Sequence, residues 1–191
     1  MKVIQRALPI LCLGSFVACA APVEDESLTG RVDSTALEIA DLKRTVTIAH
    51  EKFTSLARAM PEGDLTWRPM DGVRSVSDVY VHVAADNYFV PALMGVEPPA
   101  ETGVTSDRAT FQAYQARSMS KDEMVAAVDA SFEFLLGAID ATASDLDREV
   151  VLGTPTTVGD VWIRAVTHLH EHLGQSIAYA RSNEVVPPWS R

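Results

Sequence analysis

Residues 157–181, TVGDVWIRAVTHLHEHLGQSIAYAR, form the stretch from which the fold is predicted most directly. Thr157 followed by Asp160 is a capping-box pattern, which is typical of the first turn of an α-helix. After it, apolar residues recur three and four positions apart, as on one face of an amphipathic helix. These residues are Val161, Ala165, Val166, Leu169, Leu173 and Ile177. We therefore expect a long helix that runs to about Arg181.

Two upstream segments show the same spacing of apolar residues. One covers residues 34–60 and stops at Pro61 and Gly63; its apolar face consists of Ile39, Leu42, Val46, Ala49, Phe53, Leu56 and Met60. The other begins at a second capping-box pair, Ser120 and Glu123, and its apolar face consists of Met124, Val128, Phe132, Leu135 and Ile139. Each segment predicts one long helix.

A further helix is predicted between these two. Ser75 and Asp78 form its capping box, Pro91 should kink it and Gly95 should end it. Its apolar face consists of Val76, Val79, Tyr80 and Val83. Residues 96–119 are rich in turn formers. We expect them to form a long excursion from the helices, that is, a connecting loop that can include one short helix. No segment alternates as a strand does, so the sequence predicts an all-α fold, a four-helix bundle.

Three of the five histidines lie in residues 167–175, THLHEHLGQ. Residues four apart on a helix differ by about 40° around its axis, whereas residues two apart differ by about 200°. His168 and His172 therefore share a face, and His170 points away from it. Gln175 and Tyr179 continue the shared face. Two imidazoles at this spacing can converge on one cation.

A divalent metal such as zinc, nickel or iron needs a third protein ligand, which must come from a facing helix. His82, in SVSDVYVHVAADNYF, borders the apolar face of the second predicted helix. Three neutral imidazoles leave a coordination position open for water or substrate, as in a catalytic site. Asp86, one turn after His82, joins Gln175 and Tyr179 as a candidate to support the ligands. A fourth ligand, such as His50 or a carboxylate, would instead close the site.

The first residues have the layout of a secretory signal peptide, with Lys2 and Arg6 ahead of an apolar run over 7–18. We expect residues 1–19 to be a lipoprotein signal in which Cys19 becomes lipidated, 20–33 to be a polar tether and 34–191 to be the metal-binding domain. Cleavage after small residues near Cys19, giving simple secretion, is the alternative. Either way we expect export to the periplasm or cell envelope, and any attachment to the membrane is expected only through a lipid anchor at Cys19.

Composition excludes several classes of function. Both cysteines, Cys12 and Cys19, lie in or beside the signal, so the domain has no thiol for a disulfide or for nucleophilic chemistry. The formal charge of −10 becomes −12 when the signal is removed, because Lys2 and Arg6 leave with it. An acidic surface repels phosphate backbones, so nucleic acid is not an expected partner.

Three segments carry a resemblance to a known family: WRPMDGVRS, SVSDVYVHVAADNYF and EHLGQSIAYARSNEVVPPWSR. Together they resemble the DinB-like (YfiT/DinB) superfamily of bacterial metalloenzymes, in the same order, from about residue 34 to 190. The resemblance implies a divalent metal held by one histidine of the second helix and a His-x-x-x-His pair before Gly-Gln on the last. In this sequence those residues are His82, His168 and His172.

The resemblance implies a fold more firmly than a reaction. Some relatives resemble transferases and isomerases that use cytosolic thiols, which an exported protein would not meet; relatives are commonly dimers, so a homodimer is expected. Our hypothesis is an exported metal-dependent enzyme, of hydrolase or transferase type, that acts on an unidentified small molecule. The alternative hypothesis is a non-catalytic binding module in which the metal braces the helices.

Overall fold

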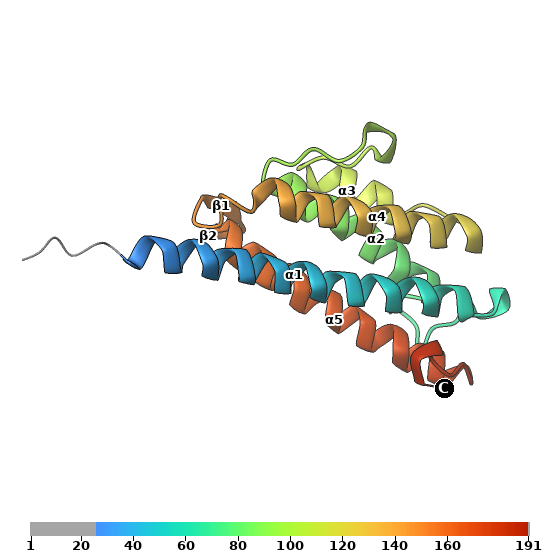
Figure 1. Ribbon diagram of the computed structural model, residues 1–191. Helices are drawn as coiled ribbons and strands as arrows, with labels where there is room; N and C mark the ends of the chain where they lie inside the picture. The colour runs from blue at the N-terminus through green and yellow to red at the C-terminus, as the bar shows by residue number, and fades with distance from the viewer. Residues whose placement is uncertain (1–25, 191) are drawn as a thin grey trace, which may run out of the picture.

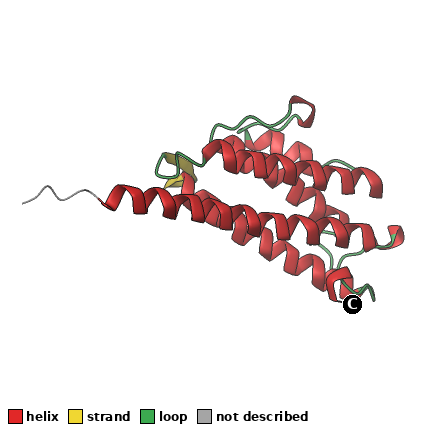
Figure 2. Ribbon diagram, in the orientation of Figure 1, coloured by secondary structure: helices red, strands yellow, loops and turns green. Residues whose placement is uncertain are grey.

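The computed structural model describes residues 26–190, which are mostly helical (Figures 1 and 2). Its five α-helices are α1 (Glu26–Ala59), α2 (Val76–Leu93), α3 (Arg108–Gln115), α4 (Lys121–Thr142) and α5 (Val158–Ser182). An antiparallel hairpin of β1 (Glu149–Leu152) and β2 (Thr154–Thr157) precedes α5. Short 3₁₀ helices cover Glu62–Asp64, Ala100–Thr102 and Pro188–Ser190. The expected signal over 1–19 and the lipidation at Cys19 lie outside the described residues.

The capping boxes begin two of the long helices as predicted. The hydroxyls of Ser75 and Ser120 each accept the backbone N–H three residues on, and the carboxylate there accepts the serine N–H in return. At Thr157 only the first half forms, because the Asp160 carboxylate accepts the Thr156 hydroxyl at 3.2 Å instead. Such caps satisfy N–H groups that a helix start leaves without partners.

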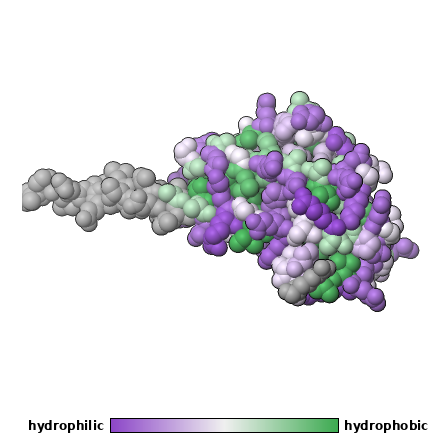
Figure 3. Space-filling model, turned by 45° about the vertical axis from the view of Figure 1, so that its right-hand side comes forward, coloured by the Kyte–Doolittle hydropathy of each residue, from purple (hydrophilic) through white to green (hydrophobic). Residues whose placement is uncertain are grey.

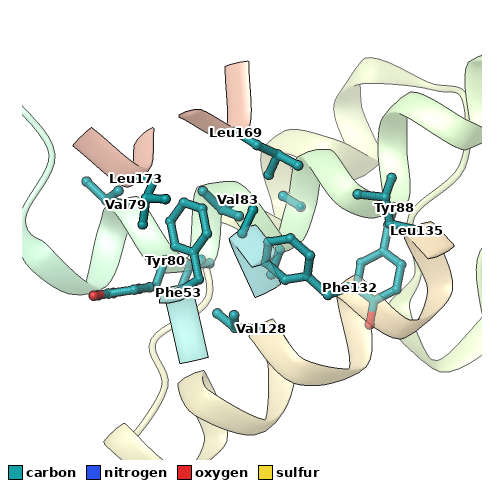
Figure 4. Close-up of a cluster of buried hydrophobic side chains, with 14 of the residues drawn as sticks. Phe53, Val79, Tyr80, Val83, Tyr88, Val128, Phe132, Leu135, Leu169 and Leu173 are labelled. Atoms are coloured by element: carbon teal, nitrogen blue, oxygen red, sulfur yellow. The ribbon is translucent and has the colours of Figure 1, made fainter. Parts of the chain in front are cut away.

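The apolar faces of α1, α2, α4 and α5 meet in one core (Figures 1 and 4). Phe53 of α1 lies at its centre, with ring centroids 6.2 Å from Tyr80 of α2 and 5.6 Å from Phe132 of α4. Leu169 and Leu173 of α5 close the core from the other side (Figure 4). The predicted faces of α2 and α4 are fully buried, whereas Ile39, Leu42, Ala165, Val166 and Ile177 are only half-buried.

Helix α3 covers the outer side of α2 and makes it the most buried helix of the fold. Phe111 and Tyr114 of α3 are buried, and Val81, Ala84 and Ala85 of α2 are buried although they lie off the predicted face. The excursion over 96–119 therefore holds one helical piece, as expected, and folds back onto the core. This packing also brings α3 next to His82.

The hairpin contradicts the expectation that the chain has no strand. Val150 pairs with Thr156 and Leu152 with Thr154, around Gly153 at φ +74°. Each strand has only four residues and one includes Pro155, so the alternation is too short to stand out. The β-branched residues on either side of a glycine were the available signal.

The start of α1 differs from the prediction, whereas α2 ends just before the predicted glycine. Helix α1 begins at Glu26 rather than Ser34, so it includes part of the expected tether, and its first turns project beyond the other helices (Figure 1). Helix α2 continues across Pro91 and ends at Leu93, before Gly95 at φ +87°. Hydrophilic side chains dominate the face in Figure 3. Within residues 26–190, no helix combines the length and apolarity that a membrane span requires.

Candidate metal centre

Helix α5 places His168 and His172 on one side, as their spacing predicts. Their ring centroids are 4.4 Å apart, and the two Nε2 atoms are separated by 3.0 Å. His170 is exposed, and its Nδ1 lies 2.8 Å from the carbonyl oxygen of Val166 on its own helix. The structure therefore brings together the pair that shares a helical face and leaves His170 outside.

His82 of α2 completes a cluster of three histidines. Its ring centroid lies 5.3 Å from that of His168 and 4.6 Å from that of His172. The side chain is buried, and Phe111 of α3 meets its ring edge-on at 6.0 Å. One ring nitrogen from each histidine lies within 4.8 Å of the others, so the cluster could hold a metal ion.

Two glutamines fix the orientation of the rings. The Nδ1–H of His82 donates to Oε1 of Gln115 at 2.6 Å, and the Nδ1–H of His172 donates to Oε1 of Gln175 at 2.8 Å. An amide oxygen only accepts hydrogen bonds, so each Nδ1 must carry the proton. Each Nε2 then presents its lone pair to the cluster, which is the tautomer that a metal requires.

A chain of hydrogen bonds holds Gln175 in place. Its Nε2 donates to the Tyr179 hydroxyl at 3.0 Å, and that hydroxyl donates to the carbonyl oxygen of Arg74 at 3.2 Å. The Arg74 guanidinium lies 3.5 Å from Oε1 of Gln115 and 3.3 Å from Nδ1 of His82. The loop before α2 therefore connects the supports of two of the three rings.

Asp86 lies against the cluster with an unpaired carboxylate oxygen. Its Oδ2 is 3.0 Å from Nε2 of His82 and 3.6 Å from Nδ1 of His168, and it is buried without a hydrogen-bond partner. Because His82 donates through Nδ1, its Nε2 lone pair faces the Asp86 oxygen. Two such atoms at this distance repel one another unless a proton or a metal cation lies between them.

Burial keeps the ring of His172 neutral. Its pKa is lowered to about 4, chiefly by burial and also by the neighbouring His168, His82 and Arg74, against the hydrogen bond to Gln175, which raises it. At neutral pH the ring is therefore uncharged and its Nε2 lone pair is free. Metal binding requires an imidazole in this state.

The separation of His168 and His172 fits one divalent ion. Zinc binds imidazole nitrogens at about 2.0–2.1 Å, so two nitrogens on one ion are at most about 4.2 Å apart. The Nε2 atoms of His168 and His172 meet this limit at 3.0 Å, whereas the bound for the full set, 4.8 Å, exceeds it by about 0.6 Å. The carboxylate of Asp86 lies beside the imidazoles of His82 and His168.

His50 and Glu171 lie outside the cluster. The Nε2 of His50 pairs with Asp129 of α4 at 2.7 Å, and its ring stacks on Phe132, so the alternative in which His50 is a fourth ligand was wrong. Glu171 is exposed. Sequence reasoning missed Gln115 and Arg74, because no spacing along the chain relates α3 or the preceding loop to His82.

A family model described as the DinB superfamily matches residues 45–176, and the chain belongs to this superfamily. A search of curated proteins finds no match. The matched segment contains all three clustered histidines and both glutamines that orient them.

Solved structures share the fold. A DinB-like protein from Bacillus cereus is 13% identical in sequence and superposes with a TM-score of 0.64. The alignment covers 77% of this chain and 93% of the Bacillus cereus chain. A DinB-like protein from Bacillus subtilis is 15% identical with a TM-score of 0.58, covering 76% and 94%. A candidate DinB family member from Exiguobacterium sibiricum is 21% identical with a TM-score of 0.57, covering 75% and 89%.

Proposed function

We propose that this protein is a metal-dependent enzyme, of hydrolase or transferase type, that holds a divalent ion through His82, His168 and His172. The observation that carries the proposal is the 3.0 Å approach of Nε2 of His82 to the unpaired Oδ2 of Asp86. A cation placed among the histidines would remove the repulsion between these atoms. Zinc, nickel and iron all accept imidazole ligands.

The residues around the ion have distinct tasks in this proposal. A divalent ion bound there would act as a Lewis acid on a polar group of a small-molecule substrate. Gln115 and Gln175 keep two rings in the ligating tautomer, and the low pKa of His172 keeps that ring neutral. Asp86 offsets the positive charge and lies within reach of a proton at the cluster.

A second function is favoured by the same carboxylate. If Asp86 acts as a fourth ligand, four donors close the coordination shell, and the metal braces α2 against α5 in a non-catalytic binding module. The two functions differ in whether an external ligand can reach the ion.

Azide binding to the cobalt-substituted protein separates the two functions. We expect azide to change the visible spectrum of the cobalt protein, as an accessible coordination position requires. A spectrum that ignores azide, in protein that contains stoichiometric cobalt, would overturn the enzyme proposal in favour of the brace. Protein without bound cobalt after purification and reconstitution would overturn both.

We further propose export with a lipid anchor at Cys19, supported by the charged, apolar and small-residue order of residues 1–19. Replacing Cys19 by alanine should move the protein from the membrane fraction to the soluble fraction without loss of helical circular dichroism. Equal membrane association of the variant would contradict lipidation. The net charge of −10 supports a small-molecule partner rather than nucleic acid.

Two structural proposals accompany this function. We classify α1, α2, α4 and α5 as a four-helix bundle to which α3 and the hairpin are additions; the shared core of the four long helices supports this. A homodimer is the proposed assembly, and sedimentation of the purified domain tests it.

A further inference from the structure

A cavity of about 380 Å³ runs between α2 and α5 and reaches the histidine cluster at His168 and Asp86. Asp86 and His168 line one end of this groove. Leu152 of β1 lines the other end, together with the C-terminal end of α2 and the N-terminal end of α5. Two further cavities, of about 360 and 470 Å³, contain none of the three histidines. The volume is in the range of pockets that bind small ligands, about 300–1000 Å³.

The walls of the groove are apolar and are held by the core. Phe89 stacks on Phe111 of α3 at 4.8 Å, and Val161 is buried. The apolar lining consists of Phe89, Val90, Leu152, Val161 and Ala165, which belong to the core or pack against it, and of the half-buried Leu93. A rigid apolar wall of this kind favours an alkyl chain over a polar one.

The length of the groove follows from the two helices that line it. The lining spans seven residue steps on each helix, from Asp86 to Leu93 on α2 and from His168 back to Val161 on α5. At a rise of about 1.5 Å per residue, this corresponds to roughly 10 Å, the length of a chain of roughly eight carbons.

Charges around the groove restrict the polar end of a ligand. Asp86 offsets part of the charge of the ion and so weakens the attraction of the cluster for an anionic group. Arg164 and Glu171, on the lining, are exposed, opposite in sign and without an ion pair in the described part of the chain, so they favour neither net charge. A neutral group with an oxygen lone pair, such as a carbonyl, suits the cluster best.

We infer that the groove binds the alkyl chain of an acyl compound, an ester or amide of about eight carbons, with its carbonyl group at the histidine cluster. The inference deepens the proposed function and rests on it for the metal at the carbonyl end. It adds a substrate class and the residues that select chain length.

Straight-chain hydroxamates of four to twelve carbons test the inference on the zinc-loaded protein, because a hydroxamate presents a carbonyl to the metal and an alkyl chain to the groove. We expect the affinity, measured by calorimetry, to rise by about threefold per methylene up to about eight carbons, and then to level off. Complete burial of a methylene gives about fourfold. Zinc-loaded protein whose affinity is independent of chain length would overturn the inference and leave the metal centre standing.

Two substitutions locate the chain. Ala165→Phe should fill the groove and abolish the dependence on chain length, and Leu93→Gln should weaken binding of the eight-carbon compound more than that of the four-carbon compound. Ala178→Phe is the matched control, because Ala178 is exposed on the same helix and does not line the groove. An unchanged chain-length dependence in folded, zinc-loaded Ala165→Phe and Leu93→Gln would contradict the assignment.

The metal-free protein separates this inference from the proposed function. Neutral N-methylamides of the same chain lengths need no metal to enter the groove. The protein could take up no zinc and still bind these amides more tightly as the chain lengthens. That result would overturn the proposed metal centre and support the proposed alkyl-binding groove. Amide affinities that do not change with length would overturn the groove in that case.

Discussion

Oε1 of Gln115, at the end of α3, accepts a hydrogen bond from Nδ1 of His82 at 2.6 Å. This bond fixes the proton on Nδ1 and turns Nε2 toward His168 and His172. Gln115→Ala should lower the affinity for zinc by about tenfold to a hundredfold, as is usual when the partner of a ligating histidine is lost. Competition with a fluorescent chelator measures the affinity.

Gln112→Ala is the control for this prediction, because Gln112 is exposed on the same helix. Its affinity should equal that of the unmodified protein. If both variants bind zinc with unchanged affinity, Gln115 does not orient the ring.

The three clustered histidines and His170 should differ sharply as ligands. Alanine in place of His82, His168 or His172 removes a donor from the cluster and should reduce the metal content of purified protein to a small fraction of one ion per chain. His170→Ala should retain full content, because its ring faces its own helix backbone rather than the cluster. Elemental analysis of tag-free protein decides; loss of metal from the His170 variant would contradict the assignment.

Asp86→Asn tests the role of the carboxylate charge. The amide keeps the size of the side chain but removes the negative charge next to Nε2 of His82. We expect zinc affinity to fall by at least about tenfold. Asp122→Asn, an exposed change of the same charge on α4, should leave the affinity within about twofold, since solvent and salt screen a distant surface charge.

Asp129 should stabilise the contact between α1 and α4 independently of the metal. Its carboxylate pairs with His50 at 2.7 Å, Thr54 at 3.0 Å and Arg58 at 3.0 Å. Asp129→Ala should lower the free energy of unfolding by about 1–2 kcal/mol, because it leaves half-buried partners unsatisfied. Urea denaturation measures it, and Asp140→Ala, which removes only an exposed pair with Lys43, should cost less.

The Asp129 contribution should disappear in acid. Burial raises the pKa of Asp129, but the bonds from His50 and Thr54 and the charges of His50 and Arg58 bring it below its usual value. The folded protein then holds the carboxylate ionised where the unfolded chain protonates it. The stabilisation is complete above the ordinary pKa of an aspartate and is lost as the pH falls through the lowered value.

Local spacing predicted the parts of the site that lie on one helix. His168 and His172 share a face because an α-helix has a fixed period, and the same period excludes His170. His82 could be placed beside them only through its position at the edge of the apolar face of α2.

The spacing of residues along the chain could not predict contacts between distant segments. Gln115 reaches His82 because the excursion over 96–119 folds α3 back onto α2, and its sequence contains no period that fixes this return. The helical start at Glu26 was missed for a different reason, since residues 26–33 lack the apolar face from which the rest of α1 was predicted.

The low pKa of His172 predicts how acid affects the metal-free protein. Its pKa is about 4 in the folded protein and about 6.5 in the unfolded chain. Between these values the unfolded chain binds a proton that the folded ring does not, so the free energy of unfolding should fall as the pH falls from 6.5 to 4.

Replacing His172 by glutamine removes the titrating group and should flatten this part of the stability curve. Bound zinc should raise the melting temperature at pH 7 and lose its effect as protons compete for the ligands. Chelation should lower the melting temperature but leave helical circular dichroism intact, because the core of α1, α2, α4 and α5 is apolar and needs no metal to form. Loss of helicity on chelation would instead make the ion a structural brace.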